Sequence, residues 1–218
     1  MKSFEFKKNQ YLNKRCFILG CGPSLNNYPL DKLSNEYTIG VNLIMNSGFT
    51  PDLLVVGDQL MLHDNIDMIY PEEGRPKFYV LRNILTKRNA FLKDIPNVHF
   101  VVGKQKTDLV DENLFFFNET GNGVICDLAI PTAIYLGFKE IYLLGVDGTH
   151  GRNSHFYDHQ NIDPDNYIES IVREDENSTS YTDLVKVLPK YDIKLYSCNT
   201  DPLCTPEIEK VEFDEVLQ

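Results

Sequence analysis

The sequence predicts an α/β domain built on a mostly parallel sheet, and three observations support this fold class. Short β-rich runs recur along the chain, and several are apolar on both faces, as strands covered by helices on both sides are. Helical segments separate some of these runs. The 218 residues are 42% hydrophobic and 24% charged, which suffices for a substantial core. We therefore expect one Rossmann-like domain over residues 1–218, with helices on both faces of the sheet.

Seven runs predict strands, and they are residues 15–20, 37–43, 52–57, 77–81, 98–102, 140–146 and 193–198. The clearest helix covers residues 123–138 and ends at Gly137, as helices often do. Pro131 inside it predicts a kink or a tightened first half. A second helix is expected over residues 178–192, where Pro189 marks the end.

One long segment fits neither pattern. Residues 147–177 are polar and weakly periodic. Compact domains seldom keep so long an irregular segment without a use for it. We expect a lid or an active-site loop there.

Charge and composition exclude several classes of protein. The net charge is −11 and no basic run is present, which argues against a nucleic-acid partner and against electrostatic attachment to an anionic membrane. Five cysteines without a CxxC pair argue against a disulfide framework or a zinc knuckle. The first ten residues lack the apolar core of a signal peptide, and no apolar run reaches the length of a membrane span. We expect a cytoplasmic protein.

Candidate site residues follow the predicted strands, because ligands of open α/β sheets bind at the carboxyl ends of strands. Asn42 follows the second strand, Asp58 the third, and Asp147 and Thr149 the sixth. The loop after the first strand consists of Gly20, Cys21, Gly22, Pro23 and Ser24, and the turn that opens the long helix consists of Thr120, Gly121, Asn122 and Gly123. All of these are expected along one edge of the sheet.

Each small-residue turn has two interpretations. Glycines allow a backbone to approach phosphate closely, and amides at a helix start favour anions. A tight strand–helix turn or an ordinary N-cap would need the same residues. The first loop matches neither GxGxxG nor a P-loop, because residue 25 is Leu and no Gly-Lys-Ser/Thr follows. Two such turns at one edge favour a phosphate-bearing ligand more than either alone.

The polar side chains also allow more than one interpretation. His150, His155 and His159 lie close together in the sequence, and they could bind a metal, supply one acid–base catalyst, or belong to a solvated loop. Asp58 and Asp147 could hold a ribose hydroxyl or a metal, or cap turns. The Asn42 amide could fix a sugar or base edge, or cap a turn.

The order of motifs resembles a known family. "ILGCGPSL", "GVN", "TGNGVICDLAIPTAIYLGFKEIYLLGVD", "NSHFYDHQ" and "YDIKLYSCNTDP" follow one another between about residues 15 and 202. This series is similar to the bacterial sialyltransferases of glycosyltransferase family 42, and to the related family of motility accessory factors and hydroxymethylpterin pyrophosphokinases. "NSHFYDHQ" is the most specific element, because it resembles the segment that carries the sialyltransferase general base.

The resemblance implies a Rossmann-like domain that binds a CMP-activated sugar without a metal cofactor. It implies that Gly20, Gly22 and Ser24 lie against the nucleotide, that Asn42 contacts the donor, and that residues 120–123 approach the cytidine and the sugar. It assigns the role of general base to His159. It also implies a glycan acceptor of lipooligosaccharide or capsule type, a cytoplasmic location that could be peripheral to the inner membrane, and possible homo-oligomers.

The sequence departs from the family pattern at two positions. A donor-site asparagine of the family falls at Asp58, and a tyrosine that steadies the leaving phosphate falls at Thr149. A carboxylate at position 58 would repel the carboxylate of a sialic acid donor. Another donor sugar is therefore an open alternative.

Three functions remain open at this stage. The first is an inverting glycosyltransferase that acts on a bacterial surface glycan. The second is a Mg-dependent pyrophosphokinase or phosphotransferase with Asp58 and Asp147 as metal ligands. The third is a non-catalytic nucleotide- or glycan-binding module, for which His159 would be dispensable.

Overall fold

One parallel sheet carries the fold. The computed structural model of the protein describes residues 4–82, 88–104, 116–118, 123–147, 155–157 and 181–218. Within these residues nine strands lie in the order β6-β5-β4-β3-β2-β1-β7-β8-β9, and every neighbouring pair is parallel. The predicted α/β class with a mostly parallel sheet is confirmed. The division of the whole chain into one domain stays a prediction.

Seven of the strands lie within two residues of the predicted bounds. They are β1 (Arg15–Leu19), β2 (Tyr37–Val41), β3 (Leu53–Val56), β4 (Phe78–Arg82), β5 (Val98–Lys104), β7 (Glu140–Leu144) and β8 (Lys194–Ser197). The sequence did not predict β6 (Phe116–Asn118) and β9 (Glu209–Lys210). These are short strands at the two edges of the sheet, and such lengths carry too few residues for a periodic signal.

The central strands are buried on both faces. In β1, Cys16 and Ile18 point into one core, and Phe17 and Leu19 point into a second core on the opposite face. All four side chains are fully buried. Successive side chains of a strand point to opposite faces, and here both faces are covered by an apolar core. These runs are therefore apolar at every position.

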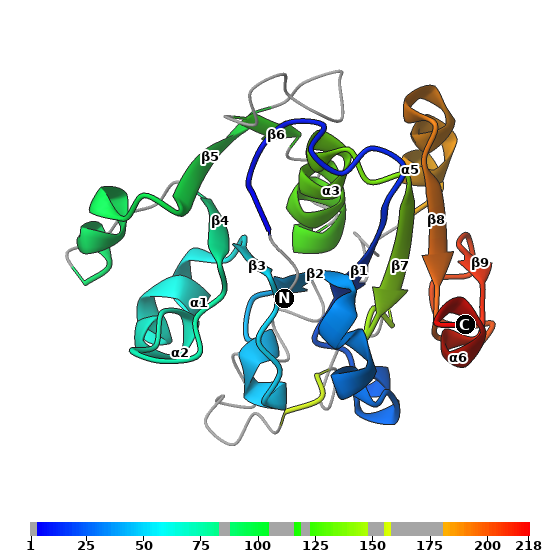
Figure 1. Ribbon diagram of the computed structural model, residues 1–218, viewed down its shortest axis with the longest axis horizontal. Coiled ribbons are helices and arrows are strands. Elements are labelled where there is room, and N and C mark those ends of the chain that lie inside the picture. Colours follow the sequence, from blue (N-terminus) through cyan, green and yellow to red (C-terminus); the bar gives the residue numbers. More distant parts are fainter. Residues whose placement is uncertain (1–3, 83–87, 105–115, 119–122, 148–154, 158–180) are drawn as a thin grey trace, which may run out of the picture.

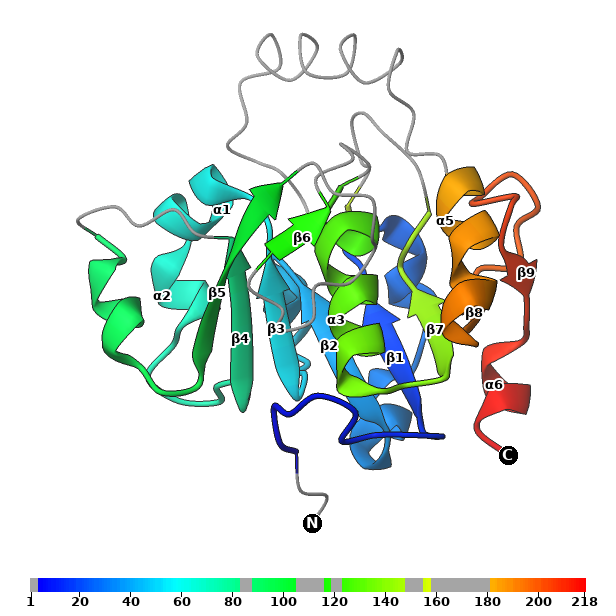
Figure 2. The same cartoon turned by 90° about the horizontal axis from the view of Figure 1, so that it is seen from above.

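Helical segments cover each face (Figure 1). The first core packs under α3 (Ile130–Leu136), α5 (Thr182–Val187) and the N-terminal segment. The second packs under α1 (Gln59–Asp64), α2 (Ile66–Ile69), α6 (Phe213–Val216) and four 3₁₀ turns, which are η1 (Pro23–Asn27), η2 (Leu30–Asn35), η3 (Ile44–Ser47) and η4 (Ala90–Asp94). Figure 2 shows α3 in front of the sheet. Among the described residues, no helix is long and apolar enough to cross a membrane.

The helix around Pro131 corrects one prediction. Its first half does not tighten; it widens into a π-helical segment, η5 (Ile125–Ala129), before α3 begins. Pro131 has no backbone N–H, and its ring would collide with the carbonyl oxygen four residues earlier in a regular α-helix. A π-helical turn opens the hydrogen-bond ladder at that point and lets the helix continue.

The second predicted helix is shorter than expected within the described residues. α5 ends at Val187, and a 3₁₀ turn, η7 (Leu188–Tyr191), carries Pro189. The predicted effect of Pro189 as the end of the α-helix is confirmed. Residues 178–180 lie outside the described part of the chain.

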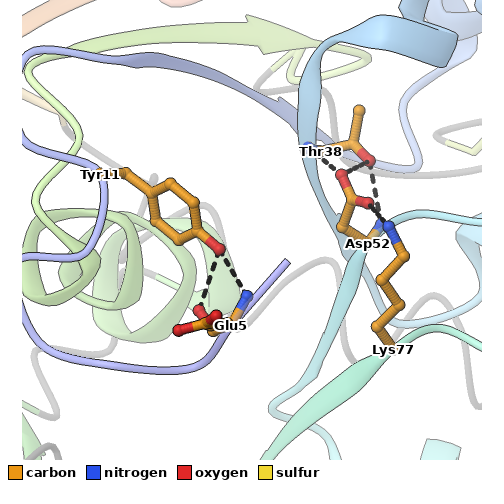
Figure 3. A network of polar contacts seen from close by, with 5 residues as sticks. All are labelled: Glu5, Tyr11, Thr38, Asp52 and Lys77. Carbon is orange, nitrogen blue, oxygen red and sulfur yellow. Dashed lines mark hydrogen bonds and ion pairs between the residues drawn. The ribbon is translucent and has the colours of Figure 1, made fainter. Parts of the chain in front are cut away.

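A polar clamp joins three strands at the amino edge of the sheet (Figure 3). The buried Asp52 carboxylate accepts hydrogen bonds from the backbone N–H and the hydroxyl of Thr38, and it pairs with Lys77 at 2.8 Å. The Asp52 N–H donates back to the Thr38 hydroxyl. The clamp fixes the starts of β2, β3 and β4, while Tyr11 and Glu5 exchange hydrogen bonds within the N-terminal segment.

A half-buried histidine makes stability depend on pH. The His99 ring stacks on Phe6 with centroids 3.9 Å apart, and its Nε2 atom has no hydrogen-bond partner among the described residues. Burial lowers the pKa of His99 below its ordinary value. The unfolded chain, with a pKa of about 6.5 at this residue, therefore binds more protons than the folded chain under mildly acidic conditions. Stability that is present above about pH 6.5 is lost as the pH falls.

We expect His99→Phe to reduce this loss. The free energy of unfolding should fall less between pH 7 and pH 5 in His99→Phe than in the native chain, as measured by urea denaturation at each pH. An unchanged slope in His99→Phe would contradict the assignment.

Candidate functional site

The strand order creates a switch point between β1 and β7. From β1 the chain advances to β2, β3 and β4 across the second core, and from β7 it advances to β8 in the opposite direction across the first core. Connections between parallel strands are right-handed. Two connections that advance in opposite directions along the sheet must therefore cover opposite faces of it. Loops that leave neighbouring strands toward opposite faces open a crevice at the carboxyl ends, which is where ligands of such sheets bind. The loops here are residues 20–24 and 145–147.

Two glycines let these loops touch. A Cβ atom on Gly20 would lie 2.4 Å from the Gly145 carbonyl oxygen, and one on Gly22 would lie 2.5 Å from the Asp147 Oδ2 atom. The Gly20 and Gly22 amides donate to the carbonyls of Leu144 at 2.8 Å and Gly145 at 2.7 Å. The two glycines therefore allow the loops after β1 and β7 to form backbone hydrogen bonds with each other.

Asp147 ties three segments together. Its buried carboxylate accepts hydrogen bonds from the Ser24 amide at 2.8 Å, from the Ser24 hydroxyl, and from the Asn199 amide group at 2.8 Å. It thus holds the start of η1 and the loop after β8 against the end of β7. Asn199 is a site residue that the sequence interpretation missed, because its partner lies 52 residues away and no local pattern marks it.

The backbone amides of the loop at residues 20–24 are bonded within the protein. The amides of Gly20, Gly22 and Ser24 already donate to acceptors of the protein. The Ser24 amide donates to the Asp147 carboxylate, so it is not directed at a ligand in this structure. Gly20, Cys21, Gly22, Pro23 and Ser24 lie at the expected edge, but an amide cradle for phosphate is not formed by these three N–H groups.

Asn42 and Asp58 both accept hydrogen bonds from backbone amides of the protein. Asn42 has a positive φ of 48°, and its side-chain oxygen accepts from the Gly57 amide at 3.4 Å. The Asp58 carboxylate caps α1 by accepting from the amides of Leu60 at 2.8 Å and Met61 at 3.1 Å. The capping interpretation is present in the structure for Asp58, whereas Asn42 links the end of β2 to the end of β3.

The start of the long helix meets these residues. A Cβ atom on Gly57 would lie 3.0 Å from the Val124 side chain, so the end of β3 packs on the first helical turn. Gly123 has a φ of +81°, a backbone conformation that favours glycine, and its Cβ direction is open. Thr120, Gly121 and Asn122 lie outside the described residues.

The predicted lid returns to the first loop at one described point. The Phe156 amide donates to the Cys21 carbonyl at 2.8 Å, and the rings of His155 and Tyr157 stack at 5.3 Å. Burial raises the pKa of the Cys21 thiol to about 12, so this cysteine is a neutral packing group that donates to the Val41 carbonyl. Thr149 and His159 lie outside the described residues.

The structure therefore brings the described candidates together as predicted, along the carboxyl ends of β1, β2, β3 and β7. Within the same part of the chain, no group of three or more His, Cys, Asp or Glu side chains is placed to hold a metal ion. Asp58 and Asp147, the two carboxylates considered as metal ligands, are each engaged by donors of the protein.

Solved structures share this fold. The sialyltransferase CstII from Campylobacter jejuni, solved in complex with the substrate analogue CMP-3FNeuAc, is 19% identical with a TM-score of 0.55, and the match covers 90% of this chain and 86% of that chain. The alpha-2,3-sialyltransferase Cst-I from Campylobacter jejuni is 20% identical with a TM-score of 0.52, over 89% of this chain and 80% of that chain.

A third match extends the likeness to a larger protein. The MAf glycosyltransferase from Magnetospirillum magneticum AMB-1 is 12% identical with a TM-score of 0.57, and the match covers 96% of this chain but 35% of that chain. The sequence matches no protein-family model and no curated protein sequence. The resemblance drawn from the motifs is thus confirmed as a shared fold.

We expect Asp147 to be a main support of this edge. Asp147→Ala should lower the free energy of unfolding by roughly 2–4 kcal/mol, because hydrogen bonds to a buried carboxylate are lost and their donors remain. Asp147→Asn should cost less, since it keeps one oxygen acceptor. Urea denaturation measures both.

The exposed Asp183 on α5 provides the matched control. Asp183→Ala should change the free energy of unfolding by no more than about 0.5 kcal/mol. A loss at Asp147 no larger than the loss at Asp183 would refute the supporting role.

Proposed function

We propose that the protein is a glycosyltransferase that transfers a sugar from a CMP-activated or other nucleotide-activated donor to a hydroxyl of a bacterial surface glycan. The observation that carries the proposal is the fold shared with CstII, a sialyltransferase solved with a CMP-sugar analogue, over most of both chains. The switch-point edge supports it, because the predicted nucleotide-binding residues that the structure describes converge there. The proposed setting is the cytoplasm, at or near the inner membrane.

The geometry favours one place for the leaving phosphate. Three amides of the loop at residues 20–24 are engaged, whereas the helix that begins at residues 123–124 continues through η5 into α3 and directs its first amides at the edge. A helix N-terminus favours an anion, and a glycine there allows close approach. In this proposal Gly123 and Thr120, Gly121 and Asn122 receive the phosphate, and Asn42 donates its NH₂ group to the donor.

The proposed reaction is a single displacement with inversion. The acceptor oxygen forms a bond to the anomeric carbon, while the bond from that carbon to the phosphate oxygen breaks. The acceptor proton passes to His159 as general base, and the electron pair leaves with the nucleotide monophosphate. Thr149 and the helix-start amides would stabilise the leaving phosphate by hydrogen bonds, which requires no metal cofactor. His155 is proposed to lie beside the acceptor.

The contacts of Asp58 and Asp147 favour this reaction over the pyrophosphokinase alternative. A two-carboxylate magnesium site needs oxygens that face the ligand. Asp58 uses one carboxylate oxygen to cap α1, whereas both oxygens of the buried Asp147 accept from donors of the protein. Binding of Mg²⁺ by Asp147 would break the contacts that join Ser24 and Asn199 to the end of β7.

We expect CMP to stabilise the protein without added metal. A ligand that binds only the folded state adds about 2.7 kcal/mol at 100 times its dissociation constant, which raises the midpoint of thermal unfolding. His159→Ala should keep this shift and lose transfer, whereas the control His63→Ala should keep both. A rise in the midpoint seen only with ATP and Mg²⁺ would contradict the proposal. Full transfer activity in His159→Ala would contradict the assignment of His159 as the general base.

We further expect Asp58 to select against an acidic donor sugar. Asp58→Asn should keep the helix cap, so the free energy of unfolding should change by no more than about 0.5 kcal/mol. The affinity for CMP-sialic acid relative to CMP should rise about threefold, because the repulsion between the Asp58 carboxylate and the sialic acid carboxylate is lost. Calorimetric titration of both ligands measures the ratio, with Asp64→Asn at the other end of α1 as control. An unchanged ratio would show that Asp58 does not face the donor sugar.

A further inference from the structure

A cavity lies beside the switch point, on the face of the sheet away from α3. Its volume is about 650 Å³, within the range of small-molecule sites. One wall comes from η1 and η2, through Asn26, Tyr28 and Asp31, and another comes from the end of η3, through Asn46 and Phe49. Phe156 and Tyr157, from the segment that docks on the first loop, complete it.

The cavity wall combines aromatic rings with carboxamides. Tyr28, Phe49, Phe156 and Tyr157 are each half-buried, so their rings contribute both to the core and to the cavity wall. The Asn46 side chain is exposed and has no hydrogen-bond partner among the described residues. Rings offer an apolar surface to the C–H face of a sugar, and a carboxamide can both donate to and accept from sugar hydroxyls.

The charge of the cavity wall limits the class of ligand that the cavity can bind. Among the described residues that line it, none is Lys, Arg or His, and Asp31 contributes a carboxylate. The nearby Lys32 is directed elsewhere and pairs with Asp214 at 2.6 Å. A carboxylate or phosphate of a ligand would find no counter-charge among the described residues of this wall and would be repelled by Asp31.

Part of the cavity wall is tied to the proposed donor site. The Phe156 amide donates to the Cys21 carbonyl at 2.8 Å, and the Asn26 side chain donates to the Phe156 carbonyl at 3.4 Å. The segment that carries Phe156 and Tyr157 therefore closes the cavity on one side and adjoins the loop after β1 on the other. Its sequence continues within two residues to His159, the proposed general base.

We propose that this cavity is an acceptor subsite that binds an uncharged sugar unit of the glycan. The inference rests on the proposed glycosyltransferase function and adds the chemical class of the acceptor. The rings stack on the sugar, Asn46 hydrogen-bonds its hydroxyls, and Asp31 excludes an acidic sugar.

Titration of the ¹⁵N-labelled protein with disaccharides, followed by amide chemical shifts, tests the subsite. The neutral probes are lactose, cellobiose and maltose, and the charged probe is 3′-sialyllactose, which is matched to lactose. At least one neutral probe should shift the amides of Ser47, Gly48 and Phe156. Lactose should bind about threefold or more tightly than 3′-sialyllactose, because the added carboxylate meets Asp31.

Two variants and one control sharpen the test. Asn46→Ala should weaken binding of the neutral probe about fivefold, the effect of one hydrogen bond. Asp31→Asn should narrow the preference for lactose over 3′-sialyllactose. Asn35→Ala, at the exposed end of η2 and outside the cavity, should change neither affinity.

The outcomes separate the subsite from the proposed function. If no neutral probe shifts these amides, or if Asn46→Ala binds as the native chain does, the subsite is overturned even when CMP stabilises the same sample. If the disaccharide binds with the expected dependence on Asn46 but no nucleotide binds, the cavity stands as a neutral-sugar site and the transferase proposal falls.

Discussion

The direct contact between the loops that follow β1 and β7 is the constraint on which the candidate site depends. Gly20 and Gly22 have no side chains, so the two loops approach closely enough for backbone hydrogen bonds to Leu144 and Gly145. The buried Asp147 carboxylate then joins Ser24 to Asn199 across three segments of the chain. The Phe156 amide bonds to the Cys21 carbonyl on this same loop, so the segment around Phe156 is held by the contact between the two loops.

The polar groups at the two edges of the sheet are bonded in different ways. At the amino edge the polar groups of Thr38, Asp52 and Lys77 satisfy one another and close the ends of three strands. At the carboxyl edge the polar groups do two things, because Asp147 and Asp58 hold backbone amides while Asn42 keeps an NH₂ group for another partner. A rigid base beneath a partly unsatisfied edge is the arrangement that places catalytic groups accurately.

Much of the fold could be predicted, because strands buried on both faces leave a continuous apolar signal, as in β1 and β7. The convergence of Gly20, Asn42, Asp58 and Asp147 followed from their positions after parallel strands. The roles of individual groups could not be predicted in the same way. The first loop uses its amides on acceptors more than 120 residues away, and Asn199 meets Asp147 only through the order of the strands. Pro131 was expected to kink its helix or to tighten the first half, and the tightening was wrong, since a widened turn removes the same clash.

A crystal structure of the protein with bound CMP tests the central claim most directly. The account predicts that the nucleotide lies at the carboxyl ends of β1, β2 and β3, with its phosphate at the helix that begins at residues 123–124 and with Asn42 in contact. It also predicts that the contacts between Asp147, Ser24 and Asn199 stay intact in the complex. A nucleotide bound away from the switch point, or a phosphate that displaces Asp147 from the Ser24 amide, would contradict it.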